Sequence, residues 1–280
     1  MGAVAIGLPP MILRWLQSLA TPCPWPLRRM GYLREQLAIE DRYRRTRGAW
    51  DPHLAASRHA VHEAIMRCQR RRTAVVLGAG LLHDVPLAEL AARFDRVVLA
   101  DILHLPKNRR LAQGAGGKVS CLEFDCTGAV DALWRAGKSM ASEEAERIVR
   151  EAEPRLPAEI AADCDLVLSM NLASQLGNLP AEWLARGRAR DSGFSLRLRR
   201  AAALRHVDWL RGMPGERLLV ADQALVIRER DGTESEREVI IGDGDIEPAQ
   251  RGWIWHLAPI PEWDRHHHLE LQVGEWRFPA

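Results

Sequence analysis

The 280-residue sequence predicts a three-layer α/β fold, in which helices cover both faces of a mostly parallel sheet. Short, continuous apolar runs such as Thr73–Leu77 have the length of strands and are typical of strands buried on both faces. Helical stretches lie between these runs, and this alternation indicates parallel strands joined by right-handed crossovers. The apolar content of 47% is sufficient for a sizeable core.

Five runs are predicted to be parallel strands. The first leads into Gly78-Ala79-Gly80, and the others cover residues 96–100, 118–124, 165–170 and 217–221. Three of them are followed by an aspartate, namely Asp101, Asp125 and Asp222. Helices are predicted over residues 84–93, 128–152, 180–187 and 196–212. Because the carboxyl ends of parallel strands meet at one edge of a sheet, we expect the polar residues there to line one crevice.

A helical extension is predicted before the first strand. Residues 21–29 are rich in proline and are expected to form an extended connection. Helices are predicted over residues 32–45 and 51–70, the second starting with Asp51 as N-cap and Pro52 as its first residue. We therefore divide the chain into this extension, residues 1–70, and a Rossmann-like domain, residues 71–280, and we expect the extension to cover part of the crevice.

The last 60 or so residues show an antiparallel pattern. Residues 225–228 and 238–241 flank an Asp231-Gly232 turn, which predicts a β-hairpin near residues 224–241. Residues 253–257 and 269–273 are two further predicted strands.

Composition excludes several classes of protein. The net charge of +2 gives no general indication of binding to nucleic acid or to a membrane surface. The apolar stretch before Arg14 is too short for a transmembrane helix. The five cysteines form no Cys-x-x-Cys pair, which is typical of reduced thiols in the cytoplasm. We expect a soluble, cytoplasmic protein that does not contact a membrane.

The glycine loop and the aspartates predict a nucleotide-like ligand. Gly78 and Gly80 lack a Cβ and allow a ligand close to the backbone. Asp101, at the end of the second strand, is placed to accept hydrogen bonds from ribose hydroxyls. His83 stands where a dinucleotide fingerprint has its third glycine, and Leu81 and Leu82 add bulk to the loop. These residues favour a ligand without a pyrophosphate.

With these residues the sequence resembles the class I S-adenosylmethionine-dependent methyltransferases, over about residues 73–223. The resemblance implies that S-adenosylmethionine is the cofactor and that residues 253–257 and 269–273 form the superfamily's antiparallel sixth and seventh strands. The cofactor-binding residues that it implies are Gly78, Ala79, Gly80, Asp101, Ile102, Asp125, Cys126 and Met170. The candidate acceptor residues are Asn171, Gln175 and His83, and the acceptor is either a small molecule or RNA.

The sequence is compatible with other functions besides an active methyltransferase. Val76 stands where the superfamily commonly has an acid, so the protein is either an active methyltransferase or a catalytically inactive binding or assembly protein with a protein partner. An NAD(P)-dependent oxidoreductase is a further alternative, although the sequence has no Tyr-x-x-x-Lys pair. Asp101 and Asp125 are also suited to capping a turn and the next helix, respectively.

Two other groups of residues are candidates for a functional role. His266, His268 and Glu270 would share one face of a strand, but no second cluster supports them and we predict no metal site. Arginine is abundant in residues 28–72 and 186–211. These segments are either solvated helix faces or a surface for an anionic acceptor such as RNA.

Overall fold

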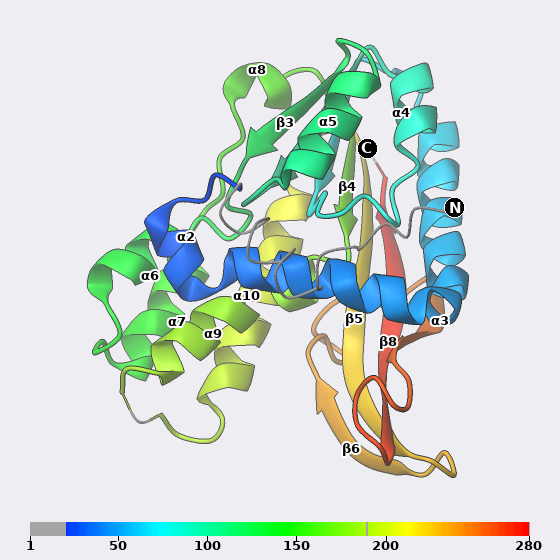
Figure 1. The fold of residues 1–280 in the computed structure, drawn as a ribbon. Coiled ribbons are helices and arrows are strands. Elements are labelled where there is room, and N and C mark those ends of the chain that lie inside the picture. The colour runs from blue at the N-terminus through cyan, green and yellow to red at the C-terminus, as the bar shows by residue number, and fades with distance from the viewer. Residues whose placement is uncertain (1–20, 189, 280) are drawn as a thin grey trace, which may run out of the picture.

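The computed structural model describes residues 21–188 and 190–279 (Figure 1). The apolar segment of residues 1–20 considered above lies outside the described residues. Within them the sheet has eight strands, in the order β3–β2–β1–β4–β5–β8–β7, and β6 pairs with β5. The strands are β1 (Thr73–Leu77), β2 (Arg96–Asp101), β3 (Val119–Glu123), β4 (Cys164–Met170), β5 (Glu216–Glu229), β6 (Glu234–Val239), β7 (Arg251–Ala258) and β8 (His267–Phe278).

The strand directions confirm the predicted fold class. Strands β1 to β5 pair in parallel with their neighbours, whereas β8 lies antiparallel to both β5 and β7. The predicted hairpin is present as the antiparallel pair of β5 and β6. Its first strand is the continuation of the predicted fifth strand, because β5 runs unbroken from the parallel sheet to Glu229.

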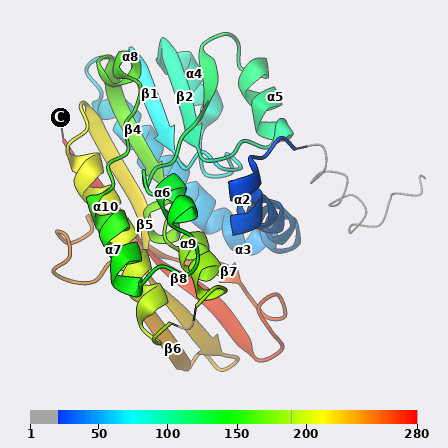
Figure 2. The same cartoon turned by 90° about the vertical axis from the view of Figure 1, so that its left-hand side faces the viewer.

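Helices cover both faces of the sheet (Figure 2). They are α2 (Trp25–Met30), α3 (Tyr32–Arg67), α4 (Leu87–Arg93), α5 (Pro106–Gly114), α6 (Val130–Ala136), α7 (Ser142–Glu151), α8 (Ala158–Ala161), the 3-10 helix η1 (Ala173–Gln175), α9 (Asn178–Ala185) and α10 (Phe194–Arg211). Successive strand residues face opposite layers, as the period of two requires. Val76 and Leu99 pack with α3 and α4, whereas Val75 and Val98 pack with α10.

The helix between β2 and β3 was not predicted. Here α5 begins at Pro106, where a missing N–H costs no helical hydrogen bond. The predicted helix over residues 128–152 is two helices, α6 and α7, which are separated by Gly137 at φ 81°.

The N-terminal prediction needs two corrections. Residues 25–30 form the helix α2 and not an extended connection, because Pro26 lies in the first turn, where its missing N–H needs no partner. The two predicted helices are present as the two halves of α3, which meet at a kink at Thr46, but Asp51 and Pro52 lie inside the second half and do not start it. The backbone leaves helical geometry earlier, at Thr46, whose hydroxyl donates to the carbonyl of Arg42 at 2.9 Å.

The bend at Thr46 gives α3 two roles. Figure 1 shows its first half crossing over the middle of the molecule and its second half running alongside the sheet. In the second half Ala60, Val61, Ala64 and Ile65 are fully buried in the core. In the described part of the chain, no helix combines the length and the apolar character needed to cross a bilayer.

Candidate functional site

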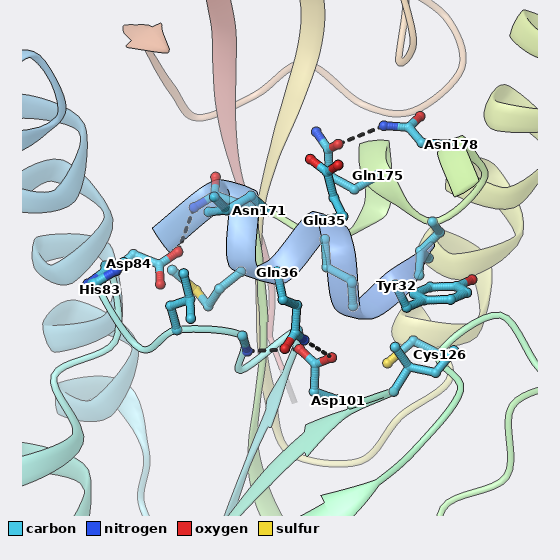
Figure 3. Close-up of a pocket in the computed structure, with 18 of the residues that line it drawn as sticks. Tyr32, Glu35, Gln36, His83, Asp84, Asp101, Cys126, Asn171, Gln175 and Asn178 are labelled. Carbon is cyan, nitrogen blue, oxygen red and sulfur yellow. Dashed lines mark hydrogen bonds between the residues drawn. The ribbon is translucent and has the colours of Figure 1, made fainter. Parts of the chain in front are cut away.

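A cavity of about 350 Å³ lies at the carboxyl ends of β1, β2 and β4. Its wall includes Gly78 and Gly80 after β1, Asp101 at the end of β2, and Met170 and Asn171 at the end of β4. The first half of α3 supplies the opposite wall with Tyr32, Glu35, Gln36, Ile39 and Arg42. Figure 3 shows this helix, which carries Tyr32, Glu35 and Gln36, running across the middle of the site.

The glycine loop needs its glycines for backbone geometry. Gly78 has φ 69°, and a Cβ there would lie 2.8 Å from the Cβ of Leu172. Gly80 has φ 41°, and its N–H donates to Asp101 Oδ2 at 2.8 Å. The Asn108 amide of α5 donates to the carbonyl of Gly80. Ala79 differs from its neighbours, because its side chain packs in the core below the loop.

Asp101 is the acceptor around which the loop is organised. Its Oδ2 accepts the hydrogen bond from the Gly80 N–H. Its Oδ1 accepts two more, from the backbone N–H of Leu103 at 3.3 Å and from the side-chain amide of Gln36 at 3.4 Å. The carboxylate thus holds a local turn and also lines the cavity. Burial raises the pKa of Asp101, and the hydrogen bond from Gly80 opposes this shift.

Asp125 lines the cavity too, but its carboxylate is occupied by its own loop. Oδ1 accepts from the backbone N–H of Thr127 at 2.9 Å and from the Thr127 hydroxyl at 2.7 Å. Oδ2 accepts from the backbone N–H of Val130, at the start of α6, at 2.9 Å. These are the contacts of a helix-capping residue. The next residue, Cys126, also lines the cavity, and burial raises the pKa of its thiol well above the usual value.

Three side chains from distant parts of the chain meet beside the end of β4. The Asn171 side-chain amide lies 2.6 Å from Asp84 Oδ2 and 3.2 Å from His53 Nε2. Asn171 has φ 49°, a left-handed conformation that directs its side chain back towards the loop after β1. His53 is 1% exposed, and burial lowers its pKa to about 3, so that its ring is neutral at pH 7.

His83, a candidate acceptor residue, lines the cavity, and its ring contacts side chains of α3. Its Nε2 lies 3.1 Å from Glu40 Oε2, and its ring stacks on Tyr43 with centroids 3.8 Å apart. The ammonium group of Lys107 donates a hydrogen bond to Glu40 Oε1 at 3.0 Å. The hydrogen bond to His83, assisted by Lys107, lowers the pKa of Glu40 to about 2, although burial opposes the shift. His83 therefore connects the glycine loop to the covering helix.

Gln175, the other acceptor candidate, lies on η1 and lines the cavity. Its amide nitrogen donates to Asp222 Oδ2 at 2.8 Å, and its oxygen accepts from Asn178 at 2.7 Å. Ile102, which follows Asp101, contributes to the wall as well. The structure thus brings every candidate residue except Ala79 to the cavity wall.

The sequence predicted that the N-terminal extension covers part of the site, but it identified none of the residues that α3 contributes, and it gave no indication of the contribution of β7. The unforeseen wall residues are Tyr32, Glu35, Gln36, Ile39, Arg42, Trp50, His53 and Leu54 from α3, Asp84 from the loop after β1, and Trp255 and Leu257 from β7. Only Asp84 carried a local signal, because it lies close to the glycine loop. The others reach the site through tertiary packing.

Acidic residues outnumber lysine and arginine in the lining of the cavity. Carboxylates line it at Glu35, Asp84, Asp101, Asp125 and Glu182. Among its lining residues within the described ranges, Arg42 is the sole lysine or arginine, and its Nε lies 3.6 Å from Glu262 Oε1. Carboxylates around an enclosed space favour a positively charged ligand over a negatively charged one.

The arginine-rich segments are largely engaged in contacts within the protein. Arg45 forms a bidentate pair with Glu262, and Arg200 forms one with Asp245. Arg197 contacts Glu146 and Asp191. The described ranges contain no group of three or more histidine, cysteine or acidic side chains placed to hold a metal ion.

No known family model matches the sequence, and no curated protein is significantly similar to it. One similar solved structure is the 1,6-didemethyltoxoflavin-N1-methyltransferase of Burkholderia thailandensis, with bound 1,6-didemethyltoxoflavin and S-adenosylhomocysteine. The two chains are 14% identical, the alignment covers 92% of each, and the TM-score is 0.41.

Proposed function

We propose that the protein is an S-adenosylmethionine-dependent methyltransferase that acts on a small molecule. The observation that carries the proposal is the acidic cavity at the carboxyl ends of the parallel strands, with Asp101 beside the glycine loop. S-adenosylmethionine carries a sulfonium and an ammonium group, and its net charge complements this lining. A dinucleotide brings a doubly charged pyrophosphate, which the same carboxylates would repel.

The loop geometry also disfavours a pyrophosphate. In dinucleotide sites the phosphates lie at the N-terminus of the helix that follows the glycine loop. Here α4 begins only at Leu87, and Leu82, with φ 59°, lies in the intervening segment. The parallel strands are followed by an antiparallel β8, in place of the sixth parallel strand of the dinucleotide-binding order.

The chain's own residues fit the parts of the cofactor. Asp101 would accept the ribose hydroxyls in exchange for the Gln36 amide, and the backbone of Gly78 and Gly80 would allow close approach. Gln36 Oε1 is buried without a hydrogen-bond partner among the described residues, so this side chain has capacity for a further contact. When bound, the cofactor supplies an electrophilic methyl group, and the cavity walls would orient the acceptor and exclude water.

A small acceptor fits better than RNA. The first half of α3 covers the cavity, and Arg42 and Arg45 of this helix face Glu262 in ion pairs. Engaged arginines of this kind offer little to a phosphate backbone, whose binding depends on free cationic groups.

The test is isothermal titration of the full-length protein with S-adenosylmethionine and S-adenosylhomocysteine. Wild type and Asp95→Ala, a control at an exposed loop aspartate, are expected to bind both. Asp101→Ala is expected to bind them more weakly. Transfer of a labelled methyl group to a small-molecule extract, and not to RNA, would then support the activity. Absence of binding, or equal binding by Asp101→Ala, would overturn the proposal, and binding without transfer would favour a protein that has lost catalysis.

A further inference from the structure

Asp84 lies in the cavity wall, and the role that we assign to it rests on the proposed function. Asp84, Asn171 and His53 form a contiguous polar cluster in the cavity wall. Figure 3 shows Asp84 and Asn171 pointing towards each other on one side of the cavity, with Tyr32 and Cys126 on the other side.

The hydrogen bonds of His53 define its tautomer. Its Nδ1 lies 3.0 Å from the indole Nε1 of Trp253. An indole nitrogen can only donate, so Nδ1 accepts and the neutral ring carries its proton on Nε2. The Nε2–H is therefore a donor directed at the amide of Asn171, 3.2 Å away.

This tautomer decides the orientation of the Asn171 amide, whose oxygen and nitrogen are assigned from their partners. With the nitrogen towards His53, two donors would face each other. With the oxygen towards His53, that oxygen accepts from Nε2–H and also lies against Asp84 Oδ2, at a separation of 2.6 Å. In either orientation the far atom of the amide has no partner among the described residues.

Two oxygens at 2.6 Å need a proton between them. The hydrogen-bond pattern therefore places a proton on Asp84. The other oxygen of Asp84 accepts no hydrogen bond from another described residue. Burial also raises the pKa of Asp84.

The surroundings of the cluster are aromatic and apolar. Trp50, Trp255, Leu54, Leu257 and Leu271 line the cavity, and the His53 ring stacks on Trp255 with centroids 3.9 Å apart. Aromatic and aliphatic walls with few fixed polar groups are typical of sites for small ring compounds.

The charged groups near Asp84 are already engaged. His83 contacts Glu40, and the Arg58 guanidinium donates to the carbonyl of His83. Arg42 is paired with Glu262. An acceptor that carries a carboxylate or phosphate would find no uncommitted cation among the described residues of this wall.

We propose that Asp84, positioned by Asn171 and His53, takes the proton released by the methyl acceptor, and that the acceptor is an uncharged ring compound methylated at an N–H or O–H group. In this step the acceptor nitrogen or oxygen forms a bond to the methyl carbon. The carbon–sulfur bond breaks with its electron pair passing to sulfur, and the acceptor's proton passes to the Asp84 carboxylate. A cationic methyl donor nearby favours the ionised carboxylate, so that cofactor binding prepares Asp84 for this role.

The unliganded protein provides the first test. Infrared difference spectra at neutral pH compare wild type with Asp84→Asn, which preserves the shape of the side chain, and with Asp95→Asn as a matched surface control. The carbonyl band of a protonated carboxyl is expected to be lost in Asp84→Asn and retained in Asp95→Asn. A spectrum of Asp84→Asn without this loss would overturn the hydrogen-bond assignment on which the proposal rests.

The second test uses two probes of different charge, S-adenosylhomocysteine and sinefungin, in which C–NH₃⁺ replaces S⁺–CH₃. Titration in buffers of different ionisation enthalpy gives the protons released on binding. For wild type we expect about one proton more with sinefungin than with S-adenosylhomocysteine, and for Asp84→Asn no difference. The preference for sinefungin is expected to fall roughly tenfold or more in Asp84→Asn, because an opposite charge nearby shifts a carboxyl pKa by about 1–3 units.

The two proposals fail in different ways. Binding of both probes with equal proton release in wild type and Asp84→Asn would overturn the role of Asp84 and leave the proposed function standing. Failure of both probes to bind would overturn the proposed function and the role of Asp84 in methyl transfer together.

Discussion

Replacing Asp125 with alanine separates two roles that the sequence alone left open. The carboxylate accepts three hydrogen bonds, two of them from the backbone N–H groups of Thr127 and Val130. Removing a helix-capping side chain costs about 0.5–2 kcal/mol. Because two backbone donors lose their partner, we expect the upper part of this range, about 1–2 kcal/mol.

In a domain of this size 1 kcal/mol corresponds to about 2–4 °C in Tm. Asp125→Ala should therefore lower the Tm by about 2–8 °C, measured by circular dichroism, with urea unfolding as a second measure. Affinity for S-adenosylhomocysteine at 20 °C or so, where the variant is folded, should change by about twofold at most. The exposed-loop variant Asp95→Ala should stay within about 0.5 kcal/mol of wild type. An unchanged Tm together with a loss of affinity of about tenfold or more would refute the capping role of Asp125. It would favour a direct contact between Asp125 and the ligand.

Three further predictions follow from the site. Asp101→Ala should weaken S-adenosylhomocysteine roughly 10- to 100-fold in titration calorimetry, since a hydrogen bond to a charged group contributes about 1.5–3 kcal/mol; unchanged affinity would contradict its ligand role. Gly78→Ala should lower the free energy of unfolding in urea by about 1–3 kcal/mol, because φ is 69° and the new Cβ meets Leu172, and Leu172→Ala should restore part of this loss. The pKa of Glu40 is lowered to about 2 by His83, so its stabilisation is present above about pH 4.5 and is lost as the pH falls towards 2. Glu40→Gln should make the free energy of unfolding in urea less dependent on pH in that range. An unchanged pH dependence would contradict the stabilising role of Glu40.

The parallel strands could be predicted because their signal is local. A strand buried on both faces is largely apolar, and β1, β2 and β4 each contain a continuous apolar run, which in β4 is Leu166–Leu168 between Asp165 and Ser169. The residues after these strands follow from the same pattern, which is why Gly78, Asp101 and Asn171 could be placed at one edge.

The residues with which α3 reaches the cavity could not be predicted in the same way. Pro52 favoured a helix start at that proline, whereas the backbone departs from helical geometry at Thr46. His53 lies 118 residues from Asn171 in the sequence, and no local pattern connects the two side chains. Asp84 gains its environment from this non-local contact, so its role could be recognised only in the folded structure.

One helix both covers the cavity and completes the core, and this has a kinetic consequence. Residues 32–45 form one wall of the cavity, and they continue through the bend at Thr46 into a half of α3 that Val61 and Ile65 anchor in the core. We expect the residence time of a ligand against this wall to depend on how firmly that second half is anchored. Core substitutions such as Ile65→Val should therefore shorten the lifetime of a bound nucleoside as well as the lifetime of the fold, even though residue 65 touches no ligand.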